Sequence, residues 1–206
     1  MARRFVWTYN PLMATKTLMT VEQFLQSPEY LAERTAEGDP PQYELDEGEM
    51  IEISSATVRH NYTRRQILVP LTVFLGQTEL GEAFDETDIR LDSNTLYKPD
   101  IVYWDAQHAA TIDPSRIPVE VIPQFVVEVV SPSNSYRSLL RRATKFRRAG
   151  VDTVWIVNDD PLEIRVFEPS GQRIVTAGES LTLPALLPGF SLEASRLLPR
   201  AGTFLP

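Results

Sequence analysis

The sequence of 206 residues contains an almost wholly apolar stretch that reads Phe125-Val126-Val127-Glu128-Val129-Val130. A continuous run of this kind is typical of a strand covered on both faces, so we predict a central strand over residues 124–130. Burying an unpaired carboxylate is costly, and Glu128 therefore needs a cation, a hydrogen-bond donor or a proton. Glu128 is either a structural partner of an arginine, a residue on a strand face turned to water, or a functional carboxylate, and its position favours the last.

Helices and further strands are predicted on both sides of this run. A helix is expected to start at Thr20, where Gln23 completes a capping box, and others cover residues 58–76 and 137–149. A hairpin over residues 43–53 turns at Glu47-Gly48, strands cover 83–91, 100–104, 151–158 and 163–167, and the 181–198 segment covers the core. This order predicts an α/β (α+β) fold with a central mixed β-sheet flanked by helices and an N-terminal β-hairpin.

The length predicts one compact domain, which we place over residues 19–198. Residues 1–18 are expected to form an N-terminal extension, and residues 199–206 a C-terminal tail. No segment has the composition of an export signal or a membrane span, which predicts a cytoplasmic protein without a membrane partner.

The composition excludes several kinds of site. The chain has no cysteine and two histidines, so a disulfide framework, a thiolate zinc site and a His-rich metal site are ruled out. The formal net charge of −8 argues against indiscriminate coating of nucleic acid. The charge is unevenly spread, however, because residues 134–150 carry six basic residues and no acidic one.

A second carboxylate is expected close to Glu128. Pro99-Asp100 opens the strand predicted before the central one, and a proline suits a strand start because it lacks an N–H. If the two strands are neighbours, Asp100 and Glu128 supply two hard oxygen ligands, which are what Mg²⁺ prefers. Such an ion, with Mn²⁺ as a substitute, activates water and stabilises a phosphoryl transition state.

These residues resemble those of the PD-(D/E)XK, restriction endonuclease-like superfamily, and more closely its bacterial Uma-two family of endonuclease-like proteins. The matching segments are Tyr43–Glu49, Arg59-His60, Lys98-Pro99-Asp100, Val127–Ser133, Ala149-Gly150-Val151, Trp155-Ile156-Val157 and Leu187–Leu192. The resemblance implies a restriction endonuclease-like fold with Asp100 and Glu128 as metal ligands. It also implies that Glu44 is a third carboxylate and that His60 approaches the site.

The sequence departs from the superfamily pattern at the catalytic lysine. That lysine is expected two residues after the second acid, where Val130 stands, and in the Uma-two branch it moves to the next helix, where Arg142 stands. Arginine keeps the positive charge but does not readily lose a proton. Lys98 and Lys145 are the other candidates for this role, since Lys98 shares a strand face with Asp100 and Lys145 lies one turn beyond Arg142.

Basic residues without acidic neighbours indicate phosphate contact. Residues 137–148 contain Arg137, Arg141 and Arg142, and the predicted helix after His60 contains Arg64 and Arg65. Such side chains bind backbone phosphates without reading sequence, although an ordinary solvated helix face is the alternative interpretation.

Three functions fit these patterns. The first is a Mg²⁺-dependent endonuclease that hydrolyses the phosphodiester bonds of nucleic acid, DNA in the first instance, with an activated water held by Asp100 and Glu128. The second is a catalytically impaired nucleic-acid-binding module on the same fold, because the usual lysine is absent. The third is an interaction protein with an acidic surface. A homodimer is expected as the assembly state.

Overall fold

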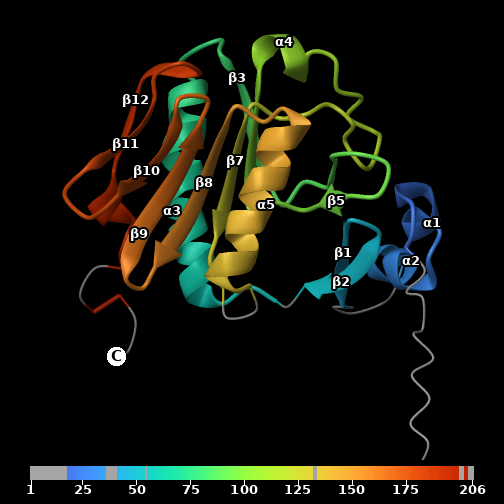
Figure 1. The fold of residues 1–206 in the computed structure, drawn as a ribbon. Helices are drawn as coiled ribbons and strands as arrows, with labels where there is room; N and C mark the ends of the chain where they lie inside the picture. The colour runs from blue at the N-terminus through green and yellow to red at the C-terminus, as the bar shows by residue number, and fades with distance from the viewer. Residues whose placement is uncertain (1–17, 36–40, 54, 132–133, 200–201, 204–206) are drawn as a thin grey trace, which may run out of the picture.

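The computed structural model describes residues 18–35, 41–53, 55–131, 134–199 and 202–203 of the chain (Figure 1). The helices are α1 (Val21–Leu25), α2 (Pro28–Thr35), α3 (Val58–Leu75), α4 (Ala106–Ala109) and α5 (Tyr136–Ala149), followed by the 3-10 helix η1 (Ala194–Leu197). The strands are β1 (Gln42–Asp46), β2 (Glu49–Ile53), β3 (Gly81–Asp85), β4 (Ile89–Arg90), β5 (Leu96–Tyr97), β6 (Ile101–Asp105), β7 (Phe125–Val129), β8 (Thr153–Asp159), β9 (Leu162–Glu168), β10 (Gly171–Val175), β11 (Ser180–Leu183) and β12 (Leu187–Glu193).

A six-stranded sheet forms the centre of the fold, in the order β10-β9-β8-β7-β6-β3. The β7–β8 pair is parallel, and the other neighbours in this sheet are antiparallel, which confirms the predicted mixed sheet. Helix α5 crosses between the two parallel strands, as such a connection requires. In Figure 1, α5 lies on one face of the sheet and α3 on the other.

The predicted central strand is β7, and all five of its residues are buried. Successive side chains of a strand point to opposite faces. Phe125, Val127 and Val129 therefore join the core cluster that contains the buried face of α3. Val126 joins the cluster that contains the buried face of α5. Glu128 lies two residues after Val126 in the strand, so its side chain points to the same face of the sheet, toward α5.

A smaller sheet, in the order β2-β1-β5-β4, stands beside α1 and α2 at one end of the molecule (Figure 1). Its β1–β2 hairpin is the predicted one, and the turn residues Glu47 and Gly48 have φ angles of 51° and 85°. The predicted capping box between Thr20 and Gln23 is also present. Leu45 of β1 packs with Leu96, Val21 and Phe24 in a separate core cluster.

The structure corrects some predicted boundaries. The strand expected over residues 83–91 is two strands, β3 and β4, because Glu86 between them has a φ of 44°, which ends the extended conformation. The 181–198 segment does cover the core on the α3 side, as expected, but it does so as the β11–β12 hairpin and η1. Strands β5 and β10 and helices α2 and α4 were not predicted, because each is short or weakly periodic.

The predicted terminal segments fall mostly on residues that the structure does not describe. Of the expected extension over residues 1–18, only Leu18 is described, and of the tail over 199–206 only residues 199, 202 and 203 are. Within the described ranges, no helix combines the length and the apolar character needed to cross a membrane.

Gly81 begins the edge strand β3 with a φ of 139°, and a Cβ there would lie 2.1 Å from the carbonyl oxygen of Trp104. We expect Gly81→Ala to lower the free energy of unfolding by at least about 2 kcal/mol, because strain and overlap add. Gly171→Ala is the matched control, since Gly171 has a φ of 135° and nothing within 4 Å. Chemical denaturation measures both variants, and equal losses would contradict the role of the close β3–β6 contact.

Candidate active site

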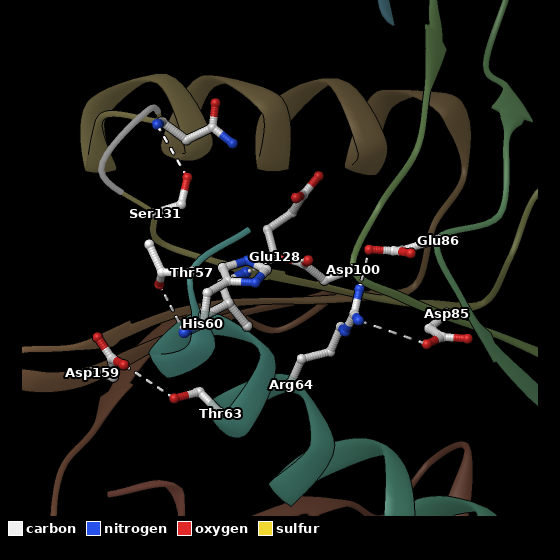
Figure 2. Close-up of polar contacts among 12 residues, drawn as sticks. Thr57, His60, Thr63, Arg64, Asp85, Glu86, Asp100, Glu128, Ser131 and Asp159 are labelled. Carbon is white, nitrogen blue, oxygen red and sulfur yellow. Dashed lines mark hydrogen bonds and ion pairs between the residues drawn. The ribbon is translucent and has the colours of Figure 1, made fainter. Parts of the chain in front are cut away.

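A cavity of about 580 Å³ opens where β6 and β7 meet the first turn of α3 (Figure 2). Its charged lining comes from elements that are far apart in the sequence. The lining includes Glu44, His60, Arg64, Lys98, Asp100, Glu128 and Arg142. Of the seven residues predicted from the sequence as catalytic, the fold brings six to this one cavity, and the seventh, Lys145, does not line it.

Asp100 and Glu128 are neighbours across the β6–β7 pair. Ile101 pairs with Val127, so the antiparallel register continued by one residue places Asp100 opposite Glu128. The backbone N–H of Val129 donates a 2.7 Å hydrogen bond to Oδ2 of Asp100. This bond fixes the Asp100 carboxylate against the end of the central strand.

His60 holds the other side of the Asp100 carboxylate. It lies in the first turn of α3, where the Thr57 hydroxyl caps the helix by accepting from the His60 N–H at 3.2 Å. Its Nε2 is 3.1 Å from Oδ1 and 3.2 Å from Oδ2 of Asp100. Burial alone lowers the pKa of His60, but the hydrogen bond and charge of Asp100 outweigh it and raise the pKa above its ordinary value. His60 therefore positions the Asp100 carboxylate.

Arg142 is the central cation of the cavity. It reaches from α5 to Glu44 of β1, with Nη1 2.5 Å from Oε2 and Nη2 2.9 Å from Oε1. The same Nη2 lies 2.7 Å from Oε1 of Glu128. The guanidinium carbon is 4.1 Å from the centre of the Tyr97 ring, which provides a cation–π contact. One side chain thus joins both sheets and neutralises two buried carboxylates.

Glu44 is held from two directions. Besides Arg142, the backbone N–H of Lys98 donates a 2.7 Å hydrogen bond to Glu44 Oε1. The resemblance implied that Glu44 is a third site carboxylate, and the structure places it in the cavity. Its oxygens contact Arg142 and the backbone, so in this geometry Glu44 orients the arginine.

Glu128 is a buried carboxylate on the central strand. Burial is the largest effect on its pKa and raises it, the Arg142 charge opposes this, and the charges of Asp100 and Glu44 raise it further. The pKa of Glu128 therefore lies above its ordinary value. Within the described part of the chain, Oε1 of Glu128 is buried and has no partner in hydrogen-bond geometry, although Arg142 is close.

The donor set fits a divalent cation in ligand type. Asp100 and Glu128 are hard oxygen ligands, and Oε1 of Glu128 makes no hydrogen bond of normal geometry within the described residues, although Nη2 of Arg142 lies 2.7 Å from it. Among the residues that the structure describes, no group of three or more acidic or histidine side chains is arranged to hold a metal. A metal here would therefore rest on two carboxylates, with water completing the coordination.

The two candidate lysines take different places. Lys98 lines the cavity, and its Nζ lies 3.7 Å from Oδ1 of Asp88. Lys145 forms ion pairs with Asp46 and Glu47 on the β1–β2 hairpin instead. Lys145 therefore ties α5 to the smaller sheet, and the catalytic role considered for it has no geometric support.

The predicted phosphate-binding arginines also divide. Arg137 and Arg141 are exposed on α5. Arg64 is mostly buried, with ion pairs to Glu86 and, at 4.0 Å, to Asp85 (Figure 2). Arg65 is exposed beside the Tyr62 ring and does not line the cavity. Of the predicted phosphate-binding arginines, Arg64 and Arg142 therefore line the cavity, whereas Arg65, Arg137 and Arg141 are exposed outside its lining.

Sequence reasoning missed Tyr97 as a site residue. Its ring supports Arg142, and its hydroxyl donates a hydrogen bond to Asp46. Burial and this acceptor raise the pKa of Tyr97. Its position directly before Lys98-Pro99-Asp100 is a signal in the sequence that Tyr97 lies near the site.

Three comparisons place the chain among known proteins. The family model "Uma2: Putative restriction endonuclease" matches residues 21–195. No curated protein matches the chain. Among solved structures, the chain is similar to one described as a putative nuclease belonging to DUF820 from Anabaena variabilis, with a TM-score of 0.71 and 17% identity, over 87% of this chain and 97% of that one. The structural similarity confirms the predicted fold class.

Removing Arg142 should be more damaging than removing Glu128. We expect Arg142→Ala to lower the free energy of unfolding by about 3–5 kcal/mol, because Glu44 and Glu128 are then left buried without a cation. Glu128→Gln should be at least as stable as the wild type at neutral pH, since it removes a buried carboxylate and Arg142 keeps its contact with Glu44. Urea denaturation compares them, and an Arg142→Ala protein as stable as the wild type would contradict the bridging role.

The raised pKa of Glu128 predicts a pH dependence in buffer without divalent ions. The folded state binds this proton more tightly than the unfolded state, so the associated stability is present at low pH and is lost as the pH rises above the ordinary carboxyl value of 4.5. Wild-type protein should therefore lose stability relative to Glu128→Gln between about pH 5 and 8. The exposed Glu82→Gln is the control, and a relative gain in wild-type stability with pH would reverse the sign of the shift.

Proposed function

Because the chain belongs to the Uma2 family, whose description is "Putative restriction endonuclease", we propose that it is a Mg²⁺-dependent endonuclease that hydrolyses DNA phosphodiester bonds. The observation that carries the proposal is the cross-strand pair of Asp100 and Glu128 in one cavity with a fixed arginine. Mn²⁺ is the expected substitute for Mg²⁺.

Asp100 and Glu128 would hold the metal ion. When bound, such an ion activates a water and stabilises charge on the phosphoryl oxygens. The surrounding protein keeps Asp100 in place through His60 and the Val129 N–H. Ligands fixed in this way are pre-organised, so less ordering is needed when substrate arrives.

Arg142 takes the electrostatic role that the superfamily gives to lysine. Its guanidinium stays charged at all relevant pH values, since burial lowers its pKa but the charges of Glu128 and Glu44 raise it overall. Glu44 and Tyr97 hold the group next to Glu128. A fixed positive charge there stabilises negative charge that develops on a phosphate, but it does not accept a proton.

The exposed arginines of α5 extend the site toward the substrate backbone. Arg137 and Arg141 lie on the helix that supplies Arg142. They would contact phosphates flanking the scissile bond and add affinity without sequence readout.

A nucleic-acid-binding module without catalysis is the second candidate. The observation that favours it is the 2.7 Å contact of Arg142 with Glu128, because a built-in cation already neutralises the carboxylate that a metal would use. Metal-induced stabilisation and cleavage distinguish the two candidates.

A homodimer and a cytoplasmic location are also proposed, and light scattering tests the homodimer.

Cleavage of plasmid and single-stranded DNA with Mg²⁺ or Mn²⁺ tests the endonuclease. Asp100→Ala with Glu128→Ala should lower the rate by at least about 100-fold, as expected when an electrostatic group of this kind is removed. Mn²⁺ should also raise the melting temperature of the wild type but not of the double variant. Glu82→Gln, which changes an exposed acid, should behave like the wild type. Full cleavage by the double variant would contradict the proposal, and binding without cleavage by the wild type would favour the second candidate.

Arg137→Ala with Arg141→Ala should weaken DNA binding and reduce its salt dependence. The slope of the logarithm of the binding constant against the logarithm of the salt concentration should be smaller by roughly 1 for each phosphate that the protein no longer neutralises. Binding titrations at several salt concentrations measure both effects. Arg173→Ala, on the edge strand β10, is the control and should leave the slope unchanged. Equal slopes for wild type and the double variant would remove α5 from the DNA interface.

A further inference from the structure

We call the cavity lined by Asp100, Glu128 and Arg142 the acidic cavity. A second cavity, of about 590 Å³, adjoins it. The two share Gln42, Glu86 and Lys98 in their linings, so a ligand can enter both at once. The volume is within the roughly 300–1,000 Å³ typical of pockets for small ligands. The endonuclease proposal uses none of the groups that are specific to this second cavity.

Apolar and aromatic side chains form its distinctive wall. Phe84 is 48% exposed and Ile117 is 56% exposed, and both line this cavity. Behind Phe84 lies the buried Trp104, with ring centres 6.1 Å apart. The alternation of β3 explains the placement, because buried Ala83 faces the α3 side of the core and Phe84 therefore faces the opposite side.

The rim of this cavity is charged. Its lining holds two basic and three acidic residues: Lys98 lies where the two cavities meet, Arg116 stands at the outer side with its side chain 63% exposed, and the acids are Glu86, Asp88 and Asp113. The apolar wall suits the face of a nucleobase, and Lys98 is a cation shared with the cavity in which a phosphate would lie. Because this cavity adjoins the one lined by Asp100 and Glu128, the phosphate next to a base bound here would lie at those two carboxylates.

We infer that the second cavity binds one unpaired nucleobase of the strand whose phosphate occupies the acidic cavity, with Phe84 and Ile117 contacting its face. The inference rests on the proposed function and names its substrate class, a strand with unpaired nucleotides beside the cleaved bond. A base within a duplex has both faces covered by its neighbours, so it enters such a pocket only after leaving the stack. Single-stranded or locally unpaired DNA is therefore the preferred substrate.

Binding without divalent ions tests this inference separately from cleavage. The probes are fluorescein-labelled dT12, a 12-mer of the same backbone without bases, and the dT12·dA12 duplex. The wild type should bind dT12 roughly 10-fold or more tightly than the strand without bases, and more tightly than the duplex. Phe84→Ala and Ile117→Ala should each remove most of this preference and leave binding of the strand without bases unchanged.

Val73→Ala is the matched control, since Val73 is 57% exposed on α3, on the other face of the sheet. Equal wild-type affinity for the two single strands, no binding of either, or equal losses on both strands in Phe84→Ala would overturn the base pocket. A lower molecular mass of Phe84→Ala in light scattering would also overturn it, by assigning the apolar wall to self-association. Retained base-dependent binding with no cleavage under any divalent ion would overturn the proposed function alone.

Discussion

The contact of Arg142 with Glu44 and Glu128 holds the two sheets and the candidate site together. It joins α5 to β1 of the smaller sheet and to β7 of the central sheet. Three carboxylates, Glu44, Asp100 and Glu128, line one cavity, and such a concentration of negative charge is unstable without cations. Arg142 supplies one within the fold, and the proposed metal would supply another. The packing of the two sheets and the chemistry of the site therefore share one electrostatic requirement.

This arrangement places stability and function in opposition. Burial on the central strand raises the pKa of Glu128, so the site resists the ionised form that a metal would need. A divalent cation would relieve this by favouring the carboxylate, which makes metal affinity and proton affinity compete for the same group. His60 and the Val129 N–H hold the Asp100 carboxylate by direct hydrogen bonds instead. The two acids are therefore prepared differently, because Asp100 has its hydrogen-bond partners within the fold whereas Glu128 still favours an added cation.

Much of this could be predicted from particular residues. The unbroken apolar run around Glu128 identified the central strand, and the Asp100 motif identified its partner, because both signals are local. The pairing of Lys145 with the hairpin acids could not be predicted, since helical spacing gives the face of a helix but not which sheet packs against it. The aromatic support from Tyr97 and the burial of Arg64 likewise depend on contacts between distant segments.

Crystals soaked in Mn²⁺ would show whether Asp100 and Glu128 bind a metal ion, because anomalous scattering locates this ion among the carboxylates. We expect one ion bound by Asp100 and Glu128, with Arg142 keeping its bidentate contact to Glu44 but withdrawn from Glu128. Crystals in which Arg142 remains against Glu128, with no ion at Asp100 even at high Mn²⁺ concentration, would contradict this expectation. The arginine would then be the permanent cation of a site that binds nucleic acid without cleaving it.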